Sequence, residues 1–194
     1  MEPAPAFVAP VEFTFDGLVI RPYRPGDGPA LATATVESYD HLRPTMPWAV
    51  SEYPIDQAEL QARRMAADYL SQKDYPVGLW DGERLLGGSG FHMRQGPVEW
   101  KASEIGMWIR VDAAGKGLGT RFLRAMLEWG FTEWGFERLV WRCDTTNLAS
   151  ASVARKCGMV LEGTNRGAAA AKTEGGARPD TYFFAMLRSD WLAS

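Results

Sequence analysis

Three glycines alternate with other residues in the segment Gly115-Lys116-Gly117-Leu118-Gly119-Thr120, between a strand-like stretch and a helix-like stretch. Glycine lets the backbone adopt left-handed conformations and lets a bound group approach the chain closely. The first turn of a helix offers backbone N–H groups without partners and the positive end of the helix dipole. The segment therefore predicts a strand that leads into a helix at a phosphate site, with Lys116 as an added positive charge. The alternative is a glycine-rich turn without a ligand.

Two widespread phosphate-binding patterns fit this segment poorly. In the Walker pattern a Ser or Thr follows the lysine, whereas Gly117 follows Lys116 here. In the dinucleotide pattern a third small residue stands where this chain has Thr120, although Asp144 could serve as the ribose-binding acid. The segments that precede the glycine turn have mostly the pattern of antiparallel strands, and the dinucleotide-binding fold does not account for them. Dinucleotide binding is kept as an alternative.

The composition excludes several classes of protein. The chain has 194 residues, 46% of them hydrophobic, which suits one domain with a large core. Its net charge of -3 argues against nucleic-acid binding. No apolar run approaches the roughly 18 residues of a membrane helix, and residues 1–10 lack the pattern of a secretory signal. Because there are only two cysteines and two histidines, we expect neither disulfides nor a metal site, and a cytoplasmic protein.

The order of the predicted elements is mixed α/β, with a single domain over residues 1–194. Strand composition marks seven segments, at 18–23, 75–80, 84–92, 98–111, 138–143, 159–161 and 182–187. Helical patterns mark four, at 29–39, 56–70, 117–134 and 147–157. We expect an N-terminal arm at 1–14 and a flexible, Gly- and Ala-rich connection at 163–178.

Several ordered motifs make the sequence similar to a known family. The stretch Glu104-Ile105-Gly106-Met107-Trp108-Ile109, followed by the glycine turn, resembles the acyl-CoA motif of the GNAT N-acetyltransferase superfamily. The spacing Asn147-x-x-Ser150-x-x-Val153-x-x-Lys156-x-Gly158-Met159-x-x-Glu162-Gly163 resembles the branch that contains the ribosomal-protein N-terminal (Rim-type) acetyltransferases. Three further pieces fit that branch: Leu18-x-Ile20-Arg21-Pro22, the loop at 41–48, and Asp180-x-x-x-Phe184 with Asp190-Trp191.

The resemblance implies a fold and a cosubstrate. The fold is a mixed, mostly antiparallel sheet of about seven strands, flanked by helices, with a splayed strand pair for acyl-CoA. The pyrophosphate of acetyl-CoA would lie on Lys116, Gly117, Leu118, Gly119 and Thr120, and its pantetheine arm along Trp108, Ile109 and Val111. Asn147 and Ser150 would face the thioester. The sequence departs from the pattern at Ala114, where a Gln or Arg is usual, so one polar contact to the phosphates is expected to be missing.

The implied reaction is direct acetyl transfer to a primary amine, either the α-amine of a protein or peptide or a small-molecule amine. At pH 7.4 an α-amine is about one-fifth neutral, whereas a lysine amine is neutral about once in a thousand. A weak base acting through water suffices for the α-amine. Glu104 is the candidate base, or a strand-edge acid in a salt bridge. Ser150 is the candidate donor to the thiolate, or a first-turn residue of a helix capped by Asn147.

The acceptor site is less legible from the sequence. Tyr39, His41 and Trp48 are candidates because they lie in or beside the loop that covers the acceptor in this branch. Simple packing is the alternative for Trp48. Glu52 and Asp56 either attract a cationic amine or form a solvated edge. A non-catalytic module that binds acyl-CoA remains an alternative to the enzyme, and the sequence leaves open the acceptor, the acyl-chain preference and a homodimer.

Overall fold

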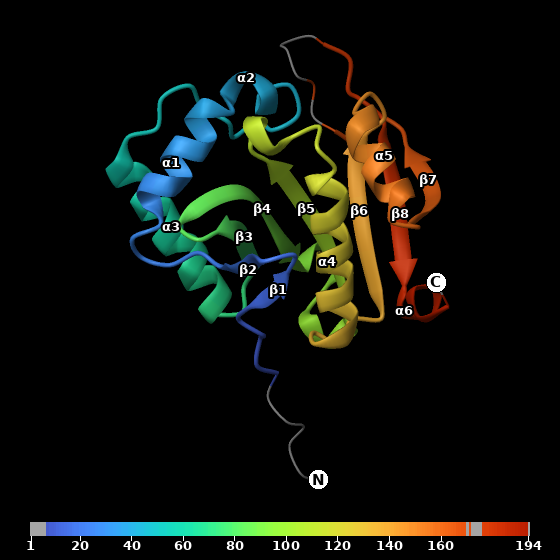
Figure 1. Cartoon of the computed structure of the whole chain (residues 1–194). Helices are drawn as coiled ribbons and strands as arrows, with labels where there is room; N and C mark the ends of the chain where they lie inside the picture. The colour runs from blue at the N-terminus through green and yellow to red at the C-terminus, as the bar shows by residue number, and fades with distance from the viewer. Residues whose placement is uncertain (1–6, 170, 172–175, 194) are drawn as a thin grey trace.

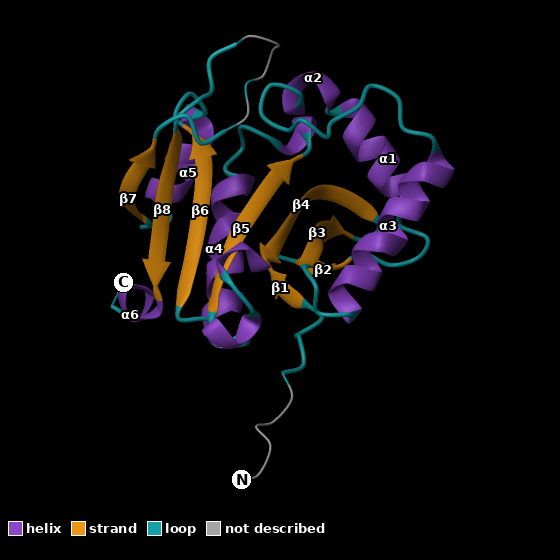
Figure 2. Cartoon of the chain, turned by 180° about the vertical axis from the view of Figure 1, so that it is seen from behind, coloured by secondary structure: helices purple, strands orange, loops and turns teal. Residues whose placement is uncertain are grey.

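The computed structural model describes residues 7–169, 171 and 176–193, and eight strands form one sheet in them. The sheet order is β1-β2-β3-β4-β5-β6-β8-β7. Neighbouring strands are antiparallel except β5 and β6, which run parallel. The strands are Phe13–Phe15 (β1), Leu18–Pro22 (β2), Tyr75–Asp81 (β3), Arg84–His92 (β4), Ala102–Ile109 (β5), Arg138–Asp144 (β6), Val160–Asn165 (β7) and Thr181–Leu187 (β8). The mostly antiparallel sheet is confirmed (Figure 2), and it removes the dinucleotide alternative, which needs a mostly parallel sheet.

The strand β1 is one more than the seven strands expected. Its first two residues, Phe13 and Thr14, fall in the segment expected to be an N-terminal arm. Asp16 and Gly17 join it to β2 with positive φ angles of 49° and 75°. Two consecutive left-handed residues suit a tight antiparallel hairpin. Phe13 stacks on Trp129 at 6.0 Å between ring centroids, and Phe15 stacks on Phe122 at 6.5 Å. The chain therefore enters the sheet at Phe13.

Helices cover both faces of the sheet (Figure 1). On one face lie α1 (Gly28–Glu37) and α3 (Ile55–Leu70), and on the other α4 (Leu118–Thr132) and α5 (Leu148–Lys156). These are the four predicted helices, and the short helices α2 (Tyr39–Leu42) and α6 (Arg188–Leu192) are additions. Within the described residues, no helix has the length and apolar character needed to cross a bilayer.

Two predicted segments have other bounds in the structure. The strand expected at 98–111 is interrupted, because Val98–Trp100 forms a 3-10 turn and Lys101 has a φ of 52°. Only Ala102–Ile109 is a strand. At the C-terminal side, β7 extends to Asn165 and so occupies the start of the expected connection at 163–178. Residues 170 and 172–175 of that connection lie outside the described residues.

A continuous core fixes α4 against the sheet. Its buried face includes Phe122, Met126 and Trp129, which pack with Phe91 of β4 and Ile105 of β5. Full burial of such a side chain contributes about 1.5–3 kcal/mol to stability. A second cluster lies beneath α1 and α3 and contains Tyr23, Leu31, Ala34, Ala62, Trp80 and Leu85. Together the two cores hold β4 and β5 between layers, which sets the position of the turn that precedes α4.

The contact between α1 and α3 depends on Gly28. A Cβ atom at this position would lie 2.5 Å from Glu59 Cα and 2.6 Å from Glu59 N, which are backbone atoms that have little room to move. We expect Gly28→Ala to lower the free energy of unfolding by about 1–3 kcal/mol through overpacking, measured by urea denaturation. The matched control is Gly163→Ala, where no atom lies within 4 Å of the new Cβ. Equal effects of the two substitutions would contradict the prediction.

Candidate active site

The site begins where β5 and β6 separate. The two strands pair only over Ala102–Ile105 and Arg138–Trp141. Beyond these pairs β5 continues along β4 to Ile109, and β6 continues along β8 to Asp144. The strands diverge toward the turn that precedes α4 (Figure 1). The expected splayed strand pair is therefore present, and its facing backbone edges are available to a ligand.

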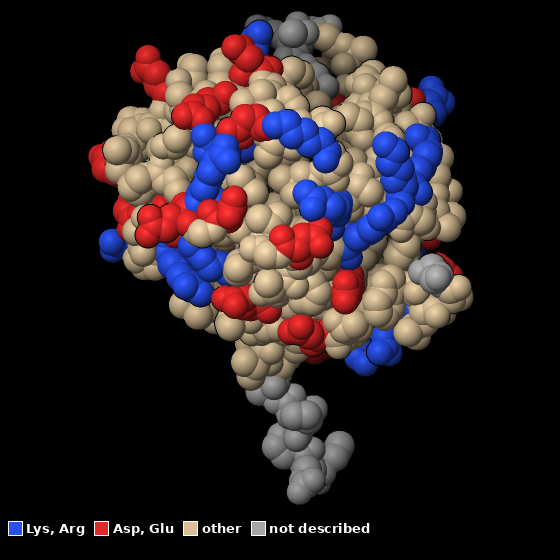
Figure 3. All heavy atoms as spheres, viewed as in Figure 1, with Lys and Arg blue, Asp and Glu red and all other residues tan. Residues whose placement is uncertain are grey.

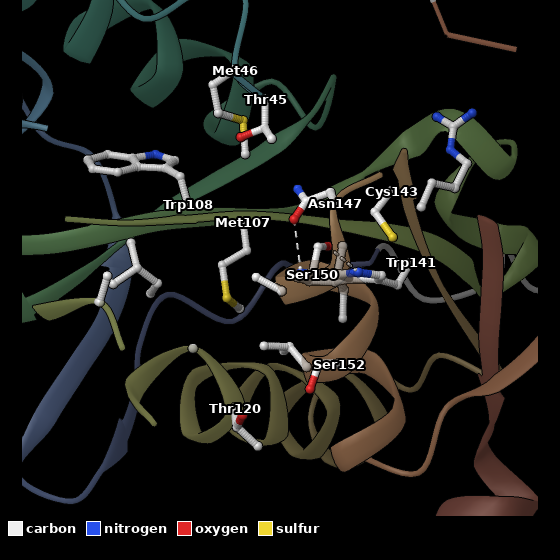
Figure 4. A pocket seen from close by; sticks show the side chains of 18 of the residues that line it. Thr45, Met46, Met107, Trp108, Thr120, Trp141, Cys143, Asn147, Ser150 and Ser152 are labelled. Carbon is white, nitrogen blue, oxygen red and sulfur yellow. Dashed lines mark hydrogen bonds between the residues drawn. The ribbon is translucent and has the colours of Figure 1, made fainter. Parts of the chain in front are cut away.

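A cleft of about 640 Å³ occupies this opening, and its size suits a cosubstrate. Most of the expected cosubstrate-binding residues line it: Trp108, Ile109, Gly117, Gly119, Thr120, Asn147 and Ser150. Figure 4 shows Met107 and Trp108 pointing to opposite sides of β5. Three expected residues are not in the lining. Leu118 is buried in the core, while Val111 and Lys116 are exposed outside the cleft.

The turn before α4 presents mainly backbone groups to the cleft. Gly115 and Gly117 have φ angles of 72° and 80°, in the region that favours glycine. Gly117 is the N-cap, and no side chain caps the first N–H groups of α4. Lys116 donates from Nζ to the carbonyl oxygen of Asp112 at 2.8 Å, so the turn itself holds its side chain. These free N–H groups, together with the helix dipole, fit an anionic phosphate.

Positive side chains lie over α4 and α5 beside this turn (Figure 3). The exposed ones are Lys116, Arg121, Arg124, Arg155 and Lys156. One of them, Arg121, is paired with Asp16 at 3.0 Å. A cluster of one sign raises the local concentration of an oppositely charged ligand. Ala114 itself lines the cleft without a polar side chain.

A buried arginine connects the turn to α1. Arg110 is 8% exposed and pairs with Glu37 at the end of α1. Its Nε lies 3.3 Å from Asp112 Oδ1, and the N–H of Val111 donates to Ser38 Oγ at 3.1 Å. The turn is thereby fixed to the helix layer on the opposite face of the sheet.

The start of α5 places Ser150 in the cleft. The side chain of Asn147 accepts a hydrogen bond from the Ser150 N–H at 3.1 Å, which confirms Asn147 as the N-cap. Ser150 Oγ accepts from Trp141 Nε1 at 3.0 Å (Figure 4). Beside it, burial raises the pKa of the Cys143 thiol, although a hydrogen bond with Ser150 acts in the opposite direction. Both groups are therefore uncharged at neutral pH, and the serine is held by its backbone and its side chain.

Glu104 lies buried between two arginines. Its side chain is 4% exposed, with Oε1 2.5 Å from Arg94 and Oε2 2.5 Å from Nε of Arg142. Of the two interpretations of the sequence, the structure therefore places Glu104 in a salt bridge. A carboxylate engaged on both oxygens would have to give up an ion pair to accept a proton from an amine.

A second pocket, of about 570 Å³, lies against α1 and α3. Aromatic and methionine side chains form much of its wall: Tyr23, Trp48, Tyr53, Trp108, Met46, Met65 and Met107. Trp48 and Trp108 contact each other edge to face, with ring centroids 5.7 Å apart. The pocket and the cleft share five lining residues, namely Met46, Arg94, Gly106, Met107 and Trp108. The two spaces therefore adjoin across β5, as a two-substrate site requires.

The three residues expected to bind the acceptor do not lie together in one pocket. Trp48 lines the second pocket, whereas His41 lines the cleft. Tyr39 lines neither. Glu52 and Asp56 are also outside both linings, and among the described residues that form the second pocket there is no Asp or Glu. The described lining of the second pocket therefore offers no carboxylate to attract a cationic amine.

Sequence reasoning missed the pair His92 and Asp74. His92 ends β4 and lines the second pocket, with Nδ1 2.7 Å from Asp74 Oδ2. Burial acts to raise the pKa of Asp74, but hydrogen bonds from His92 and from backbone N–H groups outweigh it and lower that pKa. The available signal was the alternation Gly88, Gly90, His92, which places two glycines and a histidine on one face of the strand. Nowhere in the described parts of the chain do three or more metal-ligating side chains cluster.

The role of the turn can be tested at Gly119. A Cβ here would make only ordinary contacts, at 3.7 Å to Ile109 and 3.8 Å to Val153, so a side chain fits. An acid in the first turn stabilises a helix by about 0.3–1 kcal/mol but repels a phosphate at the same place. We expect Gly119→Asp to keep the melting temperature and to weaken CoA binding about ten-fold or more by calorimetry.

The uncharged control is Gly119→Asn, which has nearly the same size as Asp. It should retain more CoA affinity than Gly119→Asp, because only the charge differs. Equal CoA affinity of the two variants would show that no phosphate group lies at this turn.

Comparison with known proteins agrees with this geometry. Residues 17–160 match the family described as "Acetyltransferase (GNAT) domain". The chain is 30% identical over 117 residues to an uncharacterized N-acetyltransferase, YnaD, of Bacillus subtilis (strain 168). That match covers 60% of this chain and 65% of YnaD, so the chain spans somewhat less than two thirds of that relative.

Solved structures share the fold at low sequence identity. A ribosomal-protein-S5-alanine acetyltransferase from Vibrio fischeri superposes with a TM-score of 0.80 at 18% identity, covering 94% of this chain and 99% of that one. The microcin C7 self-immunity acetyltransferase MccE, in complex with acetyl-CoA and AMP, gives 0.77 at 19%, covering 89% and 93%. RimL, a ribosomal L7/L12 α-N-protein acetyltransferase solved with CoA, gives 0.77 at 20%, covering 91% and 97%.

The splayed strands, the open glycine turn and the match over residues 17–160 lead to one conclusion. This chain belongs to the GNAT acetyltransferase family.

Proposed function

We propose that the chain transfers the acetyl group of acetyl-CoA to a primary amine of moderate pKa, with the α-amine of a peptide or protein preferred to a lysine side chain. The observation that carries this proposal is the wall of the second pocket. Among the described residues that form it, Arg94 is the charged group and no carboxylate is present. Such a wall offers an ammonium ion no carboxylate as an ion-pair partner, so it favours amines that lose their proton readily.

The acceptor chemistry follows from ordinary pKa values. An α-amine has a pKa of about 7.7–8.0, whereas that of lysine is about 10.4. Each unit of this difference costs about 1.4 kcal/mol to reach the neutral, nucleophilic form at a given pH. The aromatic and methionine side chains of the pocket suit an apolar group next to the amine.

Two structural neighbours support this class of acceptor. RimL is named as an α-N-protein acetyltransferase, and the Vibrio fischeri protein as acting on an alanine of ribosomal protein S5. MccE is named as a self-immunity protein against microcin C7, which favours a small-molecule amine as the second candidate. The aromatic pair Trp48 and Trp108 would serve either acceptor, because both offer a flat apolar surface.

The residues of the cleft would divide the work of the transfer. The free backbone edge of β5 beyond Ile105 would pair with the amide groups of the pantetheine arm and direct the thioester toward α5. The amine attacks the thioester carbonyl, the C–N bond forms, and the C–S bond then breaks. Ser150, held by Asn147 and Trp141, would give a proton to the departing thiolate, directly or through water, and would regain one from the nitrogen of the attacking amine.

The acceptor preference is tested with two versions of one peptide. The first has a free α-amine and an acetylated lysine, and the second has an acetylated N-terminus and a free lysine. We expect kcat/KM, measured by CoA thiol release at pH 7.4, to be at least about ten-fold higher for the first. A panel of small aromatic amines tests the second candidate. CoA binding without thiol release from any acceptor would instead support an acyl-CoA-binding module.

The role of Ser150 is tested with Ser150→Ala. Loss of a positioned proton donor should lower kcat by about ten-fold or more, with the Kd for CoA nearly unchanged because the turn at α4 remains intact. The control is Ser152→Ala, since Ser152 lies on the same helix and lines the cleft without a hydrogen bond to Trp141. Full turnover of Ser150→Ala would remove Ser150 from the mechanism.

A further inference from the structure

The groups around the acceptor pocket differ in their freedom to accept a proton. Glu104 faces a guanidinium group on each oxygen. Tyr23 and Tyr53 line the pocket, and burial raises the pKa of both hydroxyl groups, so they remain protonated at neutral pH. From α1 and α3 the pocket receives only uncharged side chains, among them Thr35 and Gln61. Among the described residues of the wall, His92 is the remaining side chain of a type that accepts a proton near neutral pH.

The contact with Asp74 determines which ring nitrogen of His92 is free. An ionised carboxylate can only accept hydrogen bonds, and its contact with Nδ1 is short, at 2.7 Å. Nδ1 must therefore carry hydrogen, which leaves the lone pair of the neutral imidazole on Nε2. Asp74 is held in turn, because its Oδ1 accepts from the Met93 N–H at 3.3 Å. This arrangement orients the ring through a carboxylate, as in established acid–base pairs.

Two glycines make room for this ring at the junction of the pocket and the cleft. A Cβ on Gly106 would lie 3.1 Å from Nε2, and a Cβ on Gly90 would lie 3.0 Å from Cε1. Gly90 and Gly106 are direct partners in the β4–β5 ladder, so the imidazole lies over both strands. Gly106 lines both the pocket and the cleft. Nε2 is therefore beside the place where the two substrates must meet.

We propose that His92 is the base that takes the proton from the acceptor amine, and that Asp74 is the residue that positions it; this inference rests on the proposed acetyl transfer. The ammonium group gives one proton to Nε2, directly or through one water molecule, and becomes a neutral amine. That amine attacks the thioester, and its second proton passes to the thiolate as the C–S bond breaks. The imidazolium then releases its proton to solvent, so atoms and charge balance.

The test compares the full-length protein with His92→Gln, using the best acceptor from the peptide and amine panel. We expect kcat at pH 7 to fall by about 100-fold or more, while the Kd for CoA is unchanged. The defect should shrink to about ten-fold or less near pH 9.5, because the amine is then neutral without a base. A merely structural role of His92 would give the same fold-loss at every pH or a loss of CoA binding.

The second variant, Asp74→Asn, leaves the imidazole in place and removes the charge that orients it. We expect a smaller loss of kcat, about ten-fold, with the same decrease of the defect at high pH. The matched control is Asp68→Asn, since Asp68 pairs with Lys73 outside both pockets and should retain wild-type kinetics. If His92→Gln does not fold, Asp74→Asn decides the question alone.

Each outcome has a separate meaning. Wild-type kcat in His92→Gln, a pH-independent loss in it, or identical behaviour of Asp74→Asn and Asp68→Asn would overturn the role of His92 while leaving the acetyltransferase intact. Absence of thiol release by the wild-type protein with every acceptor would overturn the proposed acceptor reaction and the inference with it. A pH-dependent loss in His92→Gln and Asp74→Asn, absent from Asp68→Asn, supports both.

Discussion

The early end of the parallel ladder between β5 and β6 is the constraint on which the site depends. Only four residue pairs, from Ala102 with Arg138 to Ile105 with Trp141, join the two halves of the sheet. Each strand continues with its other neighbour, so backbone groups that would be expensive to bury without partners face the opening instead. A ligand able to pair like an added strand satisfies them. The separation of the strands thus creates both the space and the hydrogen-bonding edge that the proposed binding of a pantetheine arm requires.

The remaining structure supports that opening from both layers. The buried face of α4 fixes the glycine turn against the sheet, and Arg110 ties the same turn to the end of α1. On the other side of β5, the glycines at 88, 90 and 106 present no side chains on the strand surface. Their absence leaves room for His92 and for the Trp48–Trp108 pair. The site is therefore made largely by backbone and by missing side chains. Glu104, the buried carboxylate of the cleft, is held in two ion pairs.

Much of the fold was predictable because its signals are local. The four main helices carry regular apolar faces, and the strands carry runs of β-formers, so their positions follow from periodicity. The turn at 115–119 and the cap at Asn147 were predictable for the same reason, since glycine and asparagine act on their nearest neighbours. The hairpin of β1 was missed although Asp16-Gly17 is a favourable turn, because three residues are too few to show a pattern.

The sequence by itself determined the order of the elements, the glycine turn at 115–119 and the family resemblance, all of which rest on residues close together in the chain. Only the tertiary structure decided which titratable side chains are engaged in ion pairs and which have an atom left to face a substrate. Glu104 meets Arg94 and Arg142, 10 and 38 positions away, whereas Asp74 meets His92, 18 positions away. The physical reason is that the proton affinity of a side chain depends on the charges and solvent around it. Those surroundings are set by strand register and helix packing, which no local pattern encodes.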